Sequence, residues 1–143
     1  MYYKGEKPCR KMKTLKILFP ILVLLLSCEK EDVNIDIKSN KWVVVKMKSQ
    51  GEPAFTETDE RYVLEFTNDT TYTLRLDVNS CFGYYEIINS GNITISLMGC
   101  TEVCCDSDFA KDLSQLFPKM TEYYGKGNNL IFEGEGEIVF EPE

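Results

Sequence analysis

The chain has 143 residues and a formal net charge of −7, with 23 acidic residues, 16 basic residues and no histidine. The missing histidine excludes serine–histidine and cysteine–histidine catalytic pairs, as well as histidine metal sites. The acidic balance argues against nucleic acid as a partner, because nucleic-acid phosphates are bound by clustered lysine and arginine.

The first predicted element is a secretory signal segment over residues 1–27. An apolar run at 15–26 follows a basic stretch. It fits a signal-peptide core of roughly 7–15 residues and is too short for a membrane-spanning helix of roughly 20 residues. The run ends at Leu26-Ser27-Cys28, which resembles the lipobox of a bacterial lipoprotein, so we predict that Cys28 carries the lipid. The alternative, an amphipathic or transmembrane element of the fold, is disfavoured by the same lengths.

Removal of residues 1–27 leaves 116 residues with 10 basic and 22 acidic side chains, enough for one domain with a modest core. This charge argues against broad contact with anionic lipid surfaces and is typical of a soluble monomer. Residues 28–40 are polar and lack periodicity, which predicts an acidic tether. We therefore expect a single domain over residues 41–143.

Strands dominate this predicted domain. Residues 42–47 are apolar and β-branched, residues 62–66 alternate, and residues 71–78 place Tyr72, Leu74, Leu76 and Val78 on one face. Residues 83–88 and 92–97 flank a turn at 89–91 and predict a hairpin. A second hairpin is predicted for residues 130–132 and 137–140 across 133–136.

One helix is predicted over residues 109–120. Its apolar residues recur at helical spacing, Asp106 or Ser107 can cap it, and Pro118 should kink or end it. Several short strands with one helix predict a mainly β fold, either a small antiparallel barrel or a curled sheet.

The aromatic residues of the domain are expected to fill its core, and the alternative is that they line a ligand cavity. They are Tyr62, Phe66, Tyr72, Phe82, Tyr84, Tyr85, Phe109, Phe117, Tyr123, Tyr124, Phe132 and Phe140.

Four of the six cysteines lie in the predicted domain: Cys81, Cys100, Cys104 and Cys105. An even number in an exported domain predicts two disulfides. Adjacent Cα atoms lie about 3.8 Å apart, below the usual disulfide range of roughly 4.4–6.8 Å, so a bridge between Cys104 and Cys105 is disfavoured. Two pairings remain: Cys81–Cys105 with Cys100–Cys104, or Cys81–Cys104 with Cys100–Cys105.

The alternatives to disulfides are a zinc site and a reactive free thiol. Cys81 has no nearby cysteine to complete the usual zinc-ligand spacing, and an oxidising compartment removes thiolates. Residues 106–108 begin like a calcium loop but lack its glycine and distal glutamate, so helix capping is the expected role. We predict no metal, no cofactor and no catalytic residue, and we interpret the abundant carboxylates as solvated surface.

Three segments together resemble the META/HslJ-like domain family. They are Asn79-Ser80-Cys81-Phe82-Gly83-Tyr84-Tyr85, then Gly99-Cys100-Thr101-Glu102-Val103-Cys104-Cys105, and then the helix with the strands that follow it. The resemblance covers roughly residues 41–141 and implies a lipocalin-topology, calycin-like β-barrel with one helix. It also implies the pairing Cys81–Cys105, which leaves Cys100–Cys104 as an additional bridge. The family is not known as an enzyme family.

The function expected from the sequence is that of a non-enzymatic, lipid-anchored binding or structural module of the cell envelope. Its partners would be the membrane, through the lipid on Cys28, and an unknown protein or small molecule. The alternative is an inhibitor of a secreted hydrolase, of protease or lysozyme type, that presents a rim loop at 49–59 or 125–129. Residues 28–32 also resemble the export signal of Bacteroidetes surface lipoproteins, so the expected location is the outer membrane, facing outward.

Overall fold

The computed structural model describes residues 35–143. The predicted signal segment, Cys28 and the first part of the predicted tether lie outside these residues. Among residues 35–143, no helix has both the length and the apolar character needed to cross a membrane.

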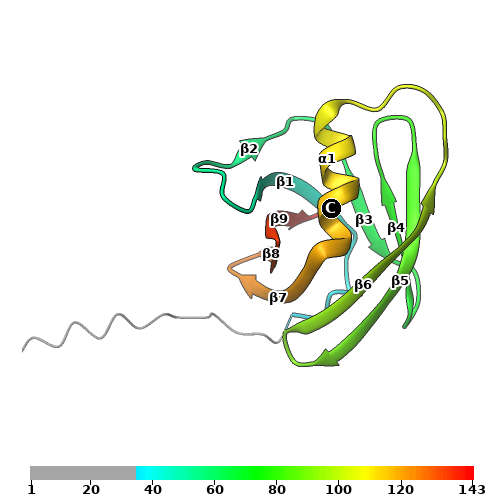
Figure 1. The fold of residues 1–143 in the computed structure, drawn as a ribbon. Coiled ribbons are helices and arrows are strands. Elements are labelled where there is room, and N and C mark those ends of the chain that lie inside the picture. The colour runs from blue at the N-terminus through cyan, green and yellow to red at the C-terminus, as the bar shows by residue number, and fades with distance from the viewer. Residues whose placement is uncertain (1–34) are drawn as a thin grey trace, which may run out of the picture.

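The described residues form nine strands and one α-helix (Figure 1). The strands are β1 (Trp42–Ser49), β2 (Thr56–Glu57), β3 (Val63–Phe66), β4 (Thr71–Arg75), β5 (Ser80–Asn89), β6 (Asn92–Cys100), β7 (Met120–Lys126), β8 (Asn129–Gly134) and β9 (Gly136–Pro142). The helical elements are α1 (Asp108–Leu116) and a short 3₁₀ helix, η1 (Phe117–Lys119). Strands β2 and β7 have no counterpart among the strands predicted from the sequence.

The strands form one antiparallel sheet that closes into a barrel. Neighbours follow the order β2-β1-β3-β4-β5-β6-β7-β8-β9, and β9 returns to pair with β1, which makes eight strands of closed barrel with β2 as an extra strand. The predicted antiparallel barrel is therefore confirmed. The closure is extensive between β1 and β9, but β6 and β7 pair at a single position, Asn92 with Glu122.

The alternating pattern of the third predicted strand holds for Tyr72, Leu74 and Leu76, which are all buried, but not for Val78. Tyr72 and Leu74 of β4 point into the core, as expected for a half-buried strand. The strand ends at Arg75, because the chain turns and the N–H of Leu76 donates to the carbonyl of Asn79 at 2.8 Å. Val78, predicted to share the buried face, is instead 51% exposed.

The packed domain begins before residue 41. Ile37 is 2% exposed, and the indole Nε1 of Trp42 donates to its carbonyl oxygen at 2.7 Å. This buried hydrogen bond satisfies the polar atom of a tryptophan that is itself fully buried. Residues 35–40, assigned from the sequence to the tether, thus include a segment that packs on the barrel.

Helix α1 begins where the sequence indicates, but it ends at Leu116, before the predicted limit at residue 120. Ser107 is the N-cap, and its Oγ accepts a hydrogen bond from the N–H of Ala110 at 3.2 Å. The α-helix stops at Leu116, and Pro118 lies in the 3₁₀ turn that follows, because proline cannot donate to the helical ladder. The buried face of the helix consists of Ala110, Leu113 and Leu116.

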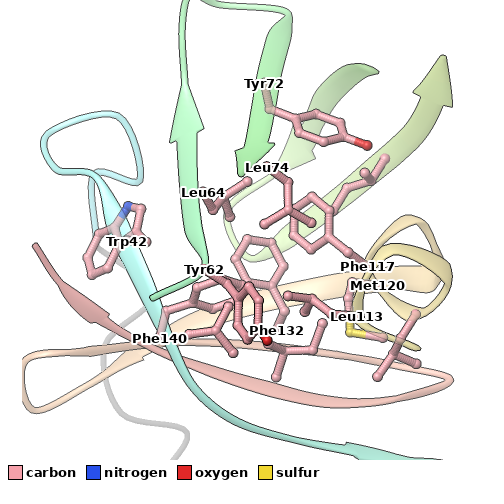
Figure 2. Packing of buried hydrophobic residues seen from close by; sticks show 14 of the residues in the cluster. Trp42, Tyr62, Leu64, Tyr72, Leu74, Leu113, Phe117, Met120, Phe132 and Phe140 are labelled. Atoms are coloured by element: carbon pink, nitrogen blue, oxygen red, sulfur yellow. The ribbon is translucent and has the colours of Figure 1, made fainter. Parts of the chain in front are cut away.

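Aromatic side chains meet in the centre of the barrel (Figure 2). The ring of Phe117 lies 5.1 Å from that of Tyr72, 5.6 Å from that of Phe132 and 6.3 Å from that of Phe140, in edge-to-face arrangements. Such pairs add to the stabilisation from burial. Most of the aromatic set predicted for the core is buried there, while Phe82 and Tyr84 are exposed.

Candidate functional site

The barrel interior is occupied by the protein's own side chains. Trp42, Tyr62, Tyr72, Phe132 and Phe140 are each less than 2% exposed and belong to one continuous cluster. A lipocalin-like ligand site requires an apolar space of several hundred cubic ångströms inside the barrel. The packing in Figure 2 places aromatic rings where that space would be, so the search for a site moves to the outer surface.

The large apolar residues that remain exposed gather on one element. Within residues 35–143, all of them fall between positions 78 and 103, on or beside the β5–β6 hairpin. They are Val78, Phe82, Tyr84, Ile87, Ile88, Leu97, Met98 and Val103. We call these eight residues the hairpin face. Clustered apolar exposure of this kind marks an interaction surface more often than scattered exposure does.

A hollow of about 530 Å³ lies on the hairpin face and is open to solvent. Its lining includes Tyr84, Glu86 and Ile87 of β5, together with Lys38 and Asp69. The ammonium of Lys38 donates to Oδ1 of Asp69 at 2.7 Å. This hydrogen bond raises the pKa of Lys38 and lowers the pKa of Asp69, so both groups stay charged at neutral pH.

The charge around the hairpin face has one sign. Residues 76–110 contain five acidic side chains and no lysine or arginine. Glu86 and Glu102 are exposed, and neither forms an ion pair with another residue in the part of the chain that the structure describes. The charged side chains on and beside the hairpin, over residues 76–110, are therefore all acidic.

A buried asparagine holds the loop that leaves β6. The side-chain Oδ1 of Asn79 accepts from the hydroxyl of Thr101 at 2.9 Å and from the N–H of Val103 at 2.7 Å. Its Nδ2 donates to the carbonyl of Val103 and to Oδ2 of Asp106, both at 2.6 Å. All four hydrogen-bonding positions of the amide are thus used. Asn79 and Thr101, which belong to different segments of the sequence resemblance, meet at this point.

A second set of hydrogen bonds joins the same turn to the helix cap. Oδ2 of Asp77 accepts from the N–H of Ser107 at 2.7 Å, and the hydroxyls of Ser107 and Tyr62 share a hydrogen bond at 3.0 Å. Burial acts to raise the pKa of Asp77, but the hydrogen bonds from Ser107 outweigh it and lower that pKa. Burial raises the pKa of Tyr62. Residues 106–108 therefore cap and fasten the helix.

The two predicted disulfides are present, but their pairing differs from both pairings inferred from the sequence. Cys81 is bridged to Cys100, and Cys104 is bridged to Cys105 across a cis peptide bond. The hairpin register places Cys81 directly opposite Cys100, with their Cα atoms 3.9 Å apart. The exclusion of a Cys104–Cys105 bridge used the Cα spacing of a trans peptide. The second strand of the hairpin was predicted to end at residue 97, whereas β6 continues to Cys100. The pairing implied by the family resemblance is likewise not the one found.

The two rim loops considered for an inhibitor adopt different structures. Within residues 125–129, only 127 and 128 form a turn, which joins β7 to β8, with Gly127 at φ 60°. In the loop at 49–59, β2 pairs back onto β1, and the ring of Phe55 lies under the ammonium groups of Lys46 and Lys48 at 4.6 and 4.7 Å. Cation–π contacts of this kind help to hold the loop against β1.

Within residues 35–143, no group of three or more histidine, cysteine or carboxylate side chains is arranged to hold a metal ion. The sequence analysis did not predict the hairpin face. Strand patterns contain apolar residues whether or not they are covered, so Leu97 and Phe82 could not be told apart from core residues. One sequence signal could have indicated it, namely the absence of basic residues over 76–110.

Known proteins resemble this chain at two levels. A family model described as the META domain matches residues 35–141. A search of curated proteins gives no match. The crystal structure of a DUF4847 family protein from Bacteroides vulgatus ATCC 8482 is similar, with a TM-score of 0.56 and 12% sequence identity. The alignment covers 74% of this chain and 94% of that chain, and at this identity it shows a shared fold.

Proposed function

We propose that this member of the META domain family is a non-enzymatic, lipid-anchored module of the cell envelope. Its barrel is filled by its own aromatic core, and it binds a partner through its hairpin face. The observation that carries the proposal is the contrast between the two surfaces of the barrel. The interior holds the aromatic cluster, whereas every exposed large apolar residue of the described chain lies on the hairpin face.

The lack of histidine, the most frequent general base, supports a non-enzymatic role. The chain has no histidine, and the carboxylates nearest the hairpin face act as structural acceptors or face solvent. Asp77 and Asp106 accept hydrogen bonds from backbone N–H groups. Each thus has a structural role that does not require a substrate.

The anchor proposal rests on Cys28 and can be tested separately from the barrel. Metabolic labelling with a radioactive fatty acid in a Bacteroidetes host should label the wild-type protein and leave Cys28→Ala unlabelled and soluble. Cys9→Ala is the matched control, because Cys9 lies in the predicted signal segment and should not affect labelling. Equal label on wild type and Cys28→Ala would contradict the anchor.

The outward orientation depends on residues 29–32. Protease added to intact cells should degrade the wild-type domain. Replacing Lys30, Glu31 and Asp32 by alanine should leave the lipid label in place but protect the domain from protease. Degradation of both proteins at the same rate would show that this segment does not direct export to the surface.

Binding at the outside rather than inside the barrel can be tested with an apolar probe. The core that would have to open for an interior ligand includes Trp42, which is 1% exposed. The probe is cis-parinaric acid, a fatty acid that fluoresces only in apolar surroundings. Any saturable binding of this probe should be lost when Leu97→Lys and Met98→Lys are introduced together. Saturable binding that these surface changes leave intact would place the ligand in the interior and refute the proposed site.

A further inference from the structure

The described chain begins at the same end of the barrel as the tip of the β5–β6 hairpin. Strand β1 starts at this end, and the antiparallel registers direct β3 and β5 toward it, so the turns at 67–70 and 90–91 both lie there (Figure 1). Two contacts agree with this placement. The ammonium of Lys38 donates to Asp69 at 2.7 Å, and Lys38 and Ile87 line the same hollow. We call this end of the barrel the tether end.

The opposite end of the barrel carries the helix. Asp112 of α1 lines the same hollow as Ser49, the last residue of β1. The turn between β4 and β5 lies at this end as well, and the side chain of Asn79 donates there to Asp106, just before the helix cap. We call this the helix end. The two ends of the barrel therefore present different surfaces.

The proposed lipid on Cys28 lies a short distance along the chain from the tether end. Seven steps separate Cys28 from Ile35, the first described residue. An extended chain advances at most about 3.6 Å per residue, so this link reaches at most about 25 Å. Strand β1 has eight residues and spans a similar length, at about 3.3 Å per residue. The helix end would touch the bilayer only if the link ran the whole length of the barrel.

The tip of the hairpin has the composition of a surface that can enter a lipid headgroup layer. Residues 87–92 read Ile-Ile-Asn-Ser-Gly-Asn and contain no charged side chain. Ile87 and Ile88 are 42% and 58% exposed. Glu86 lies one residue farther from the turn, opposite Thr94. Transfer of this tip out of water therefore removes apolar surface from water without burying a charge.

We propose that the tip of the β5–β6 hairpin, residues 87–92, rests in the headgroup layer of the membrane that holds the lipid of Cys28, with Ile87 and Ile88 at its apolar boundary. This contact orients the barrel, so that the helix end points away from the membrane. The inference rests on the proposed function, because it requires the lipid anchor.

The anchor makes a small contact sufficient. Two isoleucines do not hold a protein on a membrane by themselves, because membrane binding scales with the apolar area that is buried. A short link to an anchored lipid keeps the tip at a high effective concentration beside the bilayer. The contact therefore sets the orientation of the barrel rather than its affinity for the membrane. Phe82, Leu97 and Met98 lie farther from the turn and are left for the partner.

The test uses the lipid-bearing protein reconstituted into phosphatidylcholine vesicles. A fluorescent label is attached to Ser90→Cys at the tip or, as the matched control, to Asp112→Cys at the helix end; both positions are exposed. Some of the lipids carry a nitroxide quencher on the acyl chain close to the headgroup. They should reduce the emission of the label at position 90 about twofold, because interfacial segments lie at this depth. The label at position 112 should keep its emission.

A pair of double variants tests the two isoleucines. Ile87→Thr and Ile88→Thr, introduced together, should abolish the quenching at position 90, because threonine suits a strand but removes most of the apolar contact. Leu97→Thr with Met98→Thr is the matched control, since it makes the same replacement on the hairpin face away from the tip. It should leave the quenching intact. Quenching that persists without Ile87 and Ile88 would overturn the proposed contact.

Failure of this inference is distinguishable from failure of the proposed function. A fatty-acid label on Cys28 without quenching at position 90 would overturn the membrane contact and leave the anchor in place. Equal quenching at positions 90 and 112 would overturn the orientation and likewise leave the anchor in place. A protein without fatty-acid label on Cys28 would contradict both the anchor and this inference.

Discussion

The side-chain amide of Asn79 donates a hydrogen bond to Oδ2 of Asp106 at 2.6 Å, and this contact joins the turn before β5 to the residue before the helix cap. Asp106 in turn accepts from the N–H groups of Val78 and Asn79 at 3.1 and 3.3 Å. Two stretches of chain that are distant in sequence are held together by one amide and one carboxylate. This contact fixes the end of the barrel from which the hairpin face starts.

Asn79→Ala should destabilise the protein by about 2–4 kcal/mol, because it removes the four hydrogen bonds that the buried Asn79 side chain forms with Thr101, Val103 and Asp106. Urea unfolding followed by the fluorescence of Trp42 measures the change. Asn40→Ala is the control, since Asn40 is exposed and its side chain bonds its neighbour Ser39. Equal stability of the two variants would show that the Asn79 network contributes little.

Gly83→Ala should destabilise the barrel by about 1–3 kcal/mol, the usual cost of overpacking. A Cβ at this position would overlap the backbone oxygen of Ser96 and lie 2.9 Å from the ring of Tyr72. Gly99→Ala is the matched control in the opposite strand, because its Cβ would meet only Phe82, at 4.0 Å. Thermal unfolding of both variants should show a loss for Gly83→Ala alone.

Tyr72→Phe should leave the protein as stable as the wild type, or more stable by about 1 kcal/mol, at neutral pH. The hydroxyl of Tyr72 is buried and has no hydrogen-bond partner among residues 35–143, and an unpaired buried hydroxyl is unfavourable. Tyr85→Phe is the matched comparison, because the Tyr85 hydroxyl donates to the carbonyl of Asn68 at 2.7 Å. Chemical unfolding should show a loss of stability for Tyr85→Phe, and an equal loss for Tyr72→Phe would contradict the prediction.

The same tyrosine predicts a pH dependence. Burial raises the pKa of Tyr72 to about 12, whereas the pKa of a tyrosine in an unfolded chain is about 10. Between these values the unfolded chain loses the proton while the folded chain keeps it, so the wild-type free energy of unfolding should fall as pH rises from about 10 to about 12. This decline should be smaller in Tyr72→Phe. Identical slopes for the two proteins would contradict the assignment.

The disulfide pairing can be read from one digest under non-reducing conditions. Cleavage after glutamate separates Cys81 in peptide 66–86, Cys100 in peptide 87–102, and Cys104 with Cys105 in peptide 103–122. The observed pairing predicts that the first two peptides are linked and the third is free. Either pairing inferred from the sequence would instead link all three peptides into one species, which mass spectrometry distinguishes directly.

Local pattern predicted most of the fold. The alternation around Tyr72 and Leu74, the cap at Ser107 and the stop at Pro118 each depend on a few neighbouring residues, and each was found where it was expected. Predictions that depended on distant contacts were less accurate. Val78 continued the apolar alternation, but the turn at Asn79 placed it at the surface.

The sequence by itself determined an antiparallel β-domain with one helix, two disulfides and family membership, because periodicity, caps and cysteine number are local or compositional properties. Only the tertiary structure decided which cysteines pair, since the β5–β6 register brings Cys81 opposite Cys100. It also decided which apolar residues are covered. Leu97 and Ile95 are alike in sequence and lie two residues apart in β6, yet Ile95 is buried in the core while Leu97 stays exposed. Burial depends on what the rest of the chain places against a residue, and no short pattern contains that information.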